Sequence, residues 1–149
     1  MANLLLEWQE NQTIRTQTID GSQTSQTAPI TIGRHEGCIV KIEDPSKTVS
    51  GVHGGIFFAP EKFSFYLMNL TRDRPESNPI RVDNQIIKKE IAPLHIGTCI
   101  RLGRSTRLRV KAIYISKSCR CNHVEIQHVL PLQFLHGNCP YCGSVVVDL

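Results

Sequence analysis

An arginine, a serine and a histidine stand at the edges of one polar segment, and the arginine and the serine are the residues best suited to bind a ligand. Arg34 follows a short β-rich run that ends at Gly33, and Ser50 and His53 follow an acidic loop at residues 43–48. A guanidinium and a hydroxyl at loop edges can bind a phosphate monoester, which carries about −1.5 to −2 charges and three acceptor oxygens. Packing needs neither Arg34 nor Ser50 at such positions, so we expect them to recognise an anion.

A second set of candidate residues is a group of cysteines near the C-terminus, arranged in two closely spaced pairs. They are Cys119, Cys121, Cys139 and Cys142. Four thiolates on two adjacent hairpins form the tetrahedral site that Zn²⁺ prefers, and the run Cys-Pro-Tyr-Cys-Gly resembles a zinc-ribbon knuckle. Because no coordination position stays open, we expect the zinc ion to be structural.

Other arrangements of this tail stay open. A single residue separates Cys119 from Cys121, so His123 could replace Cys119 as a ligand, whereas His128 and His136 are less favoured. Two disulfides would need an oxidising compartment, and free thiols in a disordered tail would not suit its apolar runs. The tail is also too short to fold around a hydrophobic core alone, which favours a bound metal.

The composition is that of an ordinary globular protein. The chain has 149 residues, of which 40% are hydrophobic and 20% charged, enough for one medium domain and a small appendage. No apolar run approaches the roughly 18 residues of a membrane span, and the N-terminus lacks the basic and apolar regions of a signal peptide. We therefore expect a cytoplasmic protein whose cysteines are reduced or metal-bound.

Short runs with the two-residue period of β-strands recur along the first 115 residues. Leu4, Leu6 and Trp8 occupy alternate positions, and residues 12–19 follow as the second arm of a hairpin. Further strands are expected at residues 29–33, 38–41, 55–59, 63–69, 80–82, 98–102 and 106–115. Turn residues, Ala92-Pro93 among them, separate most of these strands, and no amphipathic helix stands out. The pattern predicts an all-β sandwich.

The same alternation predicts which side chains face the core. The expected inward-facing residues are Phe57, Ala59, Phe63, Phe65, Leu67, Leu108, Val110 and Ala112. Cys38 and Cys99 fall on predicted strands, and we expect both to be small core residues.

Basic residues gather towards the end of this region. The net charge is +4, and no acidic residue occurs between Ile91 and Val124. Such a field attracts anionic partners, whether phosphopeptide, acidic protein or nucleic acid. The alternation in the last strand explains the same residues as a solvated face, with Arg107, Arg109 and Lys111 directed to water.

Two segments interrupt the strand pattern. Residues 20–28 form a polar loop rich in Ser, Thr and Gln, which has little to bury and is expected to be mobile. Ser116-Lys117-Ser118 forms a polar joint, after which Cys and His are frequent. We therefore place a β-sandwich domain at residues 1–115 and a zinc-ribbon-like tail at residues 116–149.

A Gly-Arg pair at a strand end, followed after an acidic loop by Ser-x-x-His, resembles the forkhead-associated (FHA) domain. That family binds phosphothreonine in partner proteins. The resemblance implies that Arg34 contacts the phosphate, that Ser50 hydrogen-bonds a phosphate oxygen, and that Gly33 lets the preceding turn form. It also implies that His53 ties the binding loops together without touching phosphate.

A later pair extends the resemblance, and two positions depart from it. Ser77-Asn78 resembles the family's small hydroxyl residue followed by Asn, whose amide bonds the peptide backbone beside the phosphothreonine. The family often has Arg or Lys after the serine, where this chain has Gly51 and offers only a backbone N–H. It usually has Gly after the asparagine, where Pro79 removes a donor.

The sequence as a whole predicts a phosphothreonine-dependent adaptor in Ser/Thr kinase signalling, with Arg72 or Arg74 as candidates to replace the missing charge. No nucleophile-plus-base set, Gly-rich phosphate loop or carboxylate pair indicates an enzyme. The expected partners are a phosphothreonine-containing protein and, by resemblance, an upstream Ser/Thr kinase. The alternatives are a phospho-independent interaction module and a nucleic-acid binder that uses the ribbon and the basic strand, although stacking aromatics are few.

Overall fold

The computed structural model describes residues 2–120, 125–131 and 146–147, and the side chains of residues 2–114. The strands are β1 (Ala2–Glu10), β2 (Thr13–Asp20), β3 (Ile30–Gly33), β4 (Val40–Lys41), β5 (Gly54–Ala59), β6 (Ser64–Asn69), β7 (Ile80–Val82), β8 (Gln85–Ile87), β9 (Ile91–Leu94), β10 (Cys99–Leu102), β11 (Thr106–Arg120), β12 (Glu125–Pro131) and β13 (Val146–Val147). Two 3-10 turns, Gly21–Gln23 and Pro60–Lys62, are the only helical segments in the part described, so none there is long enough to cross a membrane.

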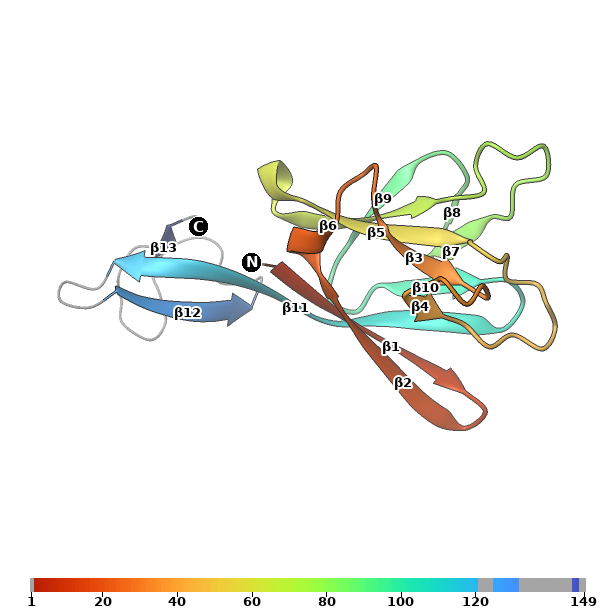
Figure 1. The fold of residues 1–149 in the computed structure, drawn as a ribbon, viewed down its shortest axis with the longest axis horizontal. Helices are drawn as coiled ribbons and strands as arrows, with labels where there is room; N and C mark the ends of the chain where they lie inside the picture. The colour runs from red at the N-terminus through yellow and green to blue at the C-terminus, as the bar shows by residue number, and fades with distance from the viewer. Residues whose placement is uncertain (1, 121–124, 132–145, 148–149) are drawn as a thin grey trace.

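Two sheets pack face to face around one hydrophobic core, as the sequence predicts (Figure 1). The larger sheet has the order β2-β1-β11-β10-β7-β8, and the smaller has the order β4-β3-β5-β6-β9. All pairs are antiparallel except β3 with β4. The core draws alternate residues from both sheets, and Leu4, Leu6, Phe65 and Leu67 in it are fully buried. The strand-rich sequence therefore forms the predicted all-β sandwich.

The prediction that Phe57 and Ala59 face this core is wrong. Ile56 lies opposite Leu67 in the β5–β6 pair, and Phe58 lies opposite Phe65, so Ile56 and Phe58 share the inner face. Phe57 instead stacks on Tyr66 on the outer face, with a centroid separation of 5.7 Å. Every residue from Ile56 to Ala59 is apolar, so alternation alone could not choose the face, and the register decides it.

A β-bulge corrects a second assignment, that of Ala112. Leu108 and Val110 are buried as predicted, but the pairing with β1 shifts after Val110 so that Lys111 is an extra residue in β11. The shift reverses the alternation. Ile113 is therefore buried, while Ala112 lies on the outer face and is only half-buried.

Two segments predicted as turn or loop are ordered parts of the fold. Residues 92–93 belong to β9, the edge strand of the smaller sheet, where Pro93 lies opposite Tyr66 and needs no ladder donor on its free side. Residues 20–28 are not a mobile loop, because Asp20 caps a 3-10 turn and Thr24 Oγ1 accepts a 2.9 Å hydrogen bond from Phe58 N. β8 has no counterpart among the predicted strands.

β11 continues without a break through Ser116–Ser118, the segment expected to be a joint. Its C-terminal half pairs with β12 and β13 and extends beyond the sandwich (Figure 1). Ladder hydrogen bonds to these strands hold the polar segment in extended conformation. The strand therefore connects the two regions that we assigned to residues 1–115 and 116–149.

The two cysteines expected in the core have different environments. Cys38 is buried beside β4, and its thiol donates a 3.3 Å hydrogen bond to Gly51 O. Cys99 is exposed on β10, opposite Arg109 on the solvent face. The assignment of Cys99 to the core is wrong because that position in the β10 alternation faces water.

Candidate functional site

Three chain segments meet at the end of the sandwich opposite β12 (Figure 1). They are the end of β3, the β4–β5 connection at residues 42–53, and the β6–β7 connection at residues 70–79. Backbone hydrogen bonds join them through one residue, because His53 N donates to Ile32 O at 2.8 Å and His53 O accepts from Leu70 N at 2.9 Å. All the predicted phosphopeptide-binding residues lie on these segments.

Gly33 allows two of the segments to approach closely. A Cβ atom at this position would lie 2.2 Å from Gly51 O, well inside van der Waals contact. The next two residues use that approach, since Arg34 N donates to Ser50 O at 3.3 Å and His35 N donates to Gly51 O at 2.9 Å. Gly33 is therefore needed for this close backbone contact.

Arg34 carries a positive charge that is not neutralised by its surroundings. Its Nε donates a hydrogen bond to Val49 O, which fixes the guanidinium beside the β4–β5 connection. Among the described residues no carboxylate lies within ion-pair distance of Arg34. The side chain is half-buried, and its terminal nitrogens remain available to an anion.

The hydroxyl of Ser50 is arranged as a donor. Its Oγ accepts hydrogen bonds from Arg74 Nη2 at 3.0 Å and from Asn78 Nδ2 at 2.9 Å. A serine hydroxyl has two acceptor lone pairs and one proton, so these two bonds use its acceptor capacity. The proton has no acceptor in the part of the chain that the structure describes, and it can therefore be given to an external oxygen.

Asn78 and Ser77 contribute differently. Asn78 Nδ2 also donates to Thr48 O at 2.9 Å, so the side-chain amide links the two connections. The side-chain oxygen Oδ1 of Asn78 makes no hydrogen bond to any described residue. Ser77 is half-buried, and its hydroxyl makes no hydrogen bond within the described chain. Both side chains thus keep polar atoms that a bound peptide backbone could use.

The buried side chain of His53 joins the β4–β5 connection to the β6–β7 connection. It is fully buried, its Nδ1 accepts from Ser50 N at 3.3 Å, and its Nε2 donates to Asn78 O at 3.1 Å. These partners assign the neutral tautomer with the proton on Nε2. Burial lowers the pKa of His53 below 6.5, the hydrogen bond to Asn78 opposes this effect, and the charge of Arg74 adds to it.

Asp44, which the sequence pattern did not single out as a site residue, shapes the β4–β5 connection. Its carboxylate accepts five hydrogen bonds, from N and Oγ of Ser46, from N and Oγ1 of Thr48, and from Val49 N. Burial raises the pKa of Asp44, but the hydrogen bonds outweigh burial and lower the pKa below 3.8. The Asp-Pro-Ser turn was a signal for this cap, since Asp side chains often bond backbone N–H groups two residues ahead.

Asn69 plays the same part in the β6–β7 connection and was also missed. It is fully buried at the end of β6, where Nδ2 donates to Asn78 O at 2.8 Å and Ile87 O at 3.1 Å. Its Oδ1 accepts from both N and Oγ1 of Thr71. A polar residue at the end of an apolar strand was the available signal, although the sequence does not reveal its distant partners.

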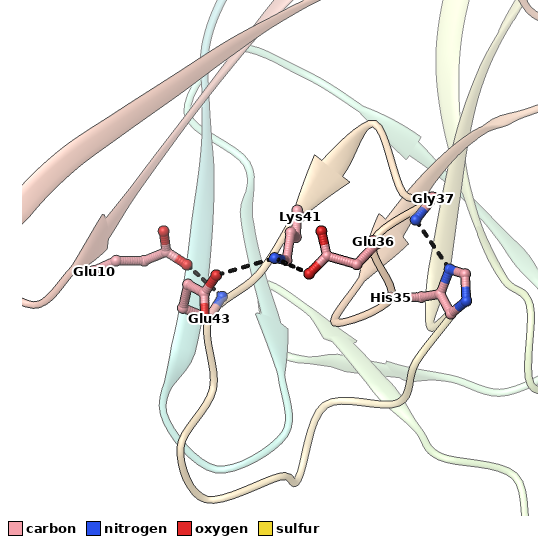
Figure 2. A network of polar contacts seen from close by, with 6 residues as sticks. All are labelled: Glu10, His35, Glu36, Gly37, Lys41 and Glu43. Carbon is pink, nitrogen blue, oxygen red and sulfur yellow. Dashed lines mark hydrogen bonds and ion pairs between the residues drawn. The ribbon is translucent and has the colours of Figure 1, made fainter.

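Figure 2 shows a network of charged side chains around Lys41. Arg34 lines the same cavity as Glu36, Lys41 and Glu43. Lys41 Nζ lies 2.5 Å from Glu36 Oε1 and 3.4 Å from Glu43 Oε1, and Glu10 accepts from Glu43 N. The hydrogen bond between Lys41 and Glu36 lowers the pKa of Glu36 and raises the pKa of Lys41. The charge of Lys41 is therefore matched by carboxylates, whereas that of Arg34 is not.

The basic residues of the last strands lie on the larger sheet. Arg101 on β10 is directly opposite Arg81 on β7 and Arg107 on β11, on the solvent face of the larger sheet. Arg107 and Arg109 are exposed, as predicted, and Lys111 pairs with Glu7 at 3.1 Å. None of them makes a hydrogen bond to Arg34 or Ser50 among the described residues, and Arg81 and Arg101 line one cavity with Pro79 and Arg104.

Residues 30–103 match the family model of the FHA domain. The chain contains an FHA domain. The matched residues run from β3 through β10 and include all three segments of the site. Among curated proteins none matches the chain.

Solved FHA domains share the fold of this one. The kinase-interacting FHA domain of the kinase-associated protein phosphatase of Arabidopsis gives a TM-score of 0.58 at 23% identity, covering 73% of this chain and 92% of that one. The FhaA FHA domain, solved with the intracellular domain of another protein, gives 0.55 at 21% identity, covering 72% and 99%. An FHA domain from work on phosphothreonine-dependent interactions gives 0.53 at 22% identity, covering 72% and 96%.

The predicted zinc ligands fall outside the described side chains. Cys121, Cys139 and Cys142, together with His123, lie outside the described residues, and Cys119 is described only as a position in β11 paired with β12 and β13. In the described part, no group of three or more His, Cys, Asp or Glu side chains could hold a metal ion.

The lowered pKa of His53 predicts a loss of stability in mild acid. Below about pH 6.5 this histidine binds a proton in the unfolded chain more readily than in the folded domain. The free energy of unfolding should therefore fall by up to about 1.4 kcal/mol per pH unit below pH 6.5. Urea denaturation at pH 7.5 and 5.5 measures the loss. His53→Gln should be less stable at pH 7.5 yet lose less on acidification, and an equal loss in both proteins would contradict this role.

Replacement of Asp44 tests the cap of the β4–β5 connection. Asp44→Ala leaves five donors without their buried acceptor and should destabilise the domain by about 2–3 kcal/mol in urea denaturation. Asp73→Ala is the matched control, because the Asp73 side chain is 91% exposed and only 3.8 Å from Arg72. If both variants lose the same small amount of stability, Asp44 does not organise the connection.

Proposed function

We propose that this FHA domain binds a phosphothreonine segment of a partner protein and acts as an adaptor in Ser/Thr kinase signalling. The observation that carries the proposal is the Ser50 hydroxyl, whose lone pairs accept from Arg74 and Asn78 and whose proton is left for an external acceptor. Arg34 stands beside it with an unmatched positive charge. The likeness to FHA domains, among them one studied for phosphothreonine-dependent interactions, supports the same function.

The chemistry of a phosphate group fits these groups. A phosphate monoester presents three acceptor oxygens and close to two negative charges. One oxygen can accept from Ser50 Oγ while others accept from the terminal nitrogens of Arg34, in charge-assisted bonds. Gly51 N makes no hydrogen bond within the described chain and adds a backbone donor at the same place. An unphosphorylated threonine would offer these donors neither the charge nor the oxygens.

The Ser77-Asn78 pair is suited to the peptide on either side of the phosphate. Asn78 is held in position by its own backbone, because Asn78 N donates to Thr71 Oγ1 at 2.8 Å and Asn78 O accepts from His53 and Asn69. The free side-chain oxygen Oδ1 of Asn78 and the Ser77 hydroxyl can then bond peptide N–H and C=O groups. We assign the domain no catalytic role.

Substitution of Arg34 tests this function. Arg34→Ala should abolish measurable binding to a phosphothreonine peptide. The Kd should rise at least about tenfold, because a charge-assisted hydrogen bond contributes about 1.5–3 kcal/mol. Fluorescence anisotropy with phosphothreonine peptides and their unphosphorylated twins measures the effect. Arg109→Ala, which removes an exposed arginine from the other sheet, is the control.

Two other functions predict different results in the same assay. A phospho-independent interaction module would bind both peptides of each pair equally. A nucleic-acid binder would instead bind a single-stranded oligonucleotide with a steep dependence on salt, and it would be weakened by Arg109→Ala more than by Arg34→Ala. Unchanged phosphopeptide affinity in Arg34→Ala would remove the site assignment.

We propose that residues 116–149 form a zinc-ribbon-like tail with Cys119, Cys121, Cys139 and Cys142 as ligands of a structural Zn²⁺, in a cytoplasmic protein. Support comes from the sequence spacing and from the pairing of β12 and β13 with β11, which brings a compact strand arrangement next to Cys119.

Metal analysis of protein purified without chelator tests the tail. We expect about one zinc per chain, since four thiolates complete one tetrahedral site. Cys142→Ser should lose the metal, whereas Cys99→Ser, which changes an exposed thiol on β10, should retain it. A zinc content well below one per chain in the wild type would contradict the proposal.

A further inference from the structure

We propose that Arg74 supplies the second positive charge of the phosphate site, in place of the side chain that Gly51 lacks. The inference rests on the proposed phosphothreonine-binding function and adds a residue from a different loop to that site. Two cations would then flank the Ser50 hydroxyl, Arg34 from the end of β3 and Arg74 from the β6–β7 connection.

The position of the Arg74 guanidinium supports this assignment. Its Nη2 donates to Ser50 Oγ at 3.0 Å, so it already contacts the hydroxyl whose proton is available to an anion. An oxygen that accepts from Ser50 at the usual distance of about 2.7 Å therefore lies within a few ångströms of the guanidinium. Arg74 has four further N–H donors in a rigid fork, and these can bond a second phosphate oxygen while Nη2 keeps its contact with Ser50.

Charge balance also distinguishes Arg74 from its neighbour. Arg72 Nε lies 3.8 Å from Asp73 Oδ2, so a local carboxylate partly offsets its charge. Arg74 has no carboxylate within ion-pair distance among the residues described. Of the two arginines that the sequence put forward, only Arg74 both reaches Ser50 and keeps its charge unmatched.

The loop that carries Arg74 is held firmly at its base. Arg74 N donates to Thr71 O at 3.1 Å, and Thr71 is itself buried and bonded through N and Oγ1 to Asn69 Oδ1. The backbone of Arg74 is thus fixed relative to the sandwich, while its side chain is exposed at the site. Fixing the backbone lowers the entropy cost of placing the charge when a ligand binds.

Gly51 provides a direct way to test whether a charge at position 51 can replace the charge of Arg74. A Cβ atom built on Gly51 meets nothing within 4 Å, and its φ is not in the left-handed region, so a longer side chain fits without strain. An arginine introduced there starts next to Ser50, the residue that Arg74 contacts. If the site needs a second charge and not Arg74 as such, Gly51→Arg should substitute for it.

The experiment compares five proteins with the tightest-binding peptide from a phosphothreonine library and with its unphosphorylated twin. They are the wild type, Arg74→Ala, Arg72→Ala, Gly51→Arg and the double variant Gly51→Arg/Arg74→Ala. We expect Arg74→Ala to weaken phosphopeptide binding about 10-fold or more, as for loss of one charge-assisted bond. Arg72→Ala should change Kd less than about twofold, in line with an exposed local ion pair. The double variant should recover most of the lost affinity.

The outcomes separate this inference from the function on which it rests. If the wild type binds the phosphopeptide and Arg74→Ala binds it equally well, the inference is wrong and the proposed function stands. If Arg74→Ala is weakened but Gly51→Arg does not restore binding, the loss comes from a disturbed Ser50 and not from missing charge. If the wild type does not distinguish the phosphopeptide from its twin, the proposed function itself fails. Urea denaturation of each variant controls for loss of the fold.

Discussion

The buried imidazole of His53 is the interaction on which the site depends. One ring nitrogen accepts from the backbone of Ser50 and the other donates to the backbone of Asn78, so a single side chain fixes the distance between two connections that are far apart in sequence. The bond from Ser50 N requires an unprotonated Nδ1, and burial favours the neutral ring because it lowers the pKa of His53. Without this bridge Asn78, Arg74 and Leu70 would still bond the β4–β5 connection, but the backbone of Ser50 would lose its link through the imidazole to the backbone of Asn78.

Buried polar groups extend the same principle to each connection. Asp44 satisfies backbone donors of residues 46–49, and Asn69 binds both the start and the end of the β6–β7 connection. Such groups cost free energy to bury unless all their hydrogen-bonding atoms are paired, and here they are paired with backbone atoms that define loop shape. The sandwich core supplies the stability, while these few polar residues decide where Arg34, Ser50 and Arg74 lie.

Prediction from the sequence succeeded for features that the local residue pattern determines. The alternation of Leu4, Leu6 and Trp8 placed β1 correctly, and the motif around Arg34 and Ser50 led to residues that the structure brings together. It failed where pairing with a distant strand decides the outcome, as for the bulge at Lys111 and the edge position of Pro93. Asn69 was missed for the same reason, because its partners at Asn78 and Ile87 lie far along the chain.

The position of charge in the site shows why a departure from a motif need not remove a function. The affinity for a phosphate group depends on where the guanidinium and hydroxyl groups lie in space, and not on the chain positions that carry them. At Gly51 the sequence lacks a cation, yet the β6–β7 connection brings Arg74 Nη2 to 3.0 Å from the Ser50 hydroxyl. The β6–β7 connection is thus the element that carries a cation to Ser50. Because Asn69 and Thr71 anchor that connection, the position of the charge is well determined.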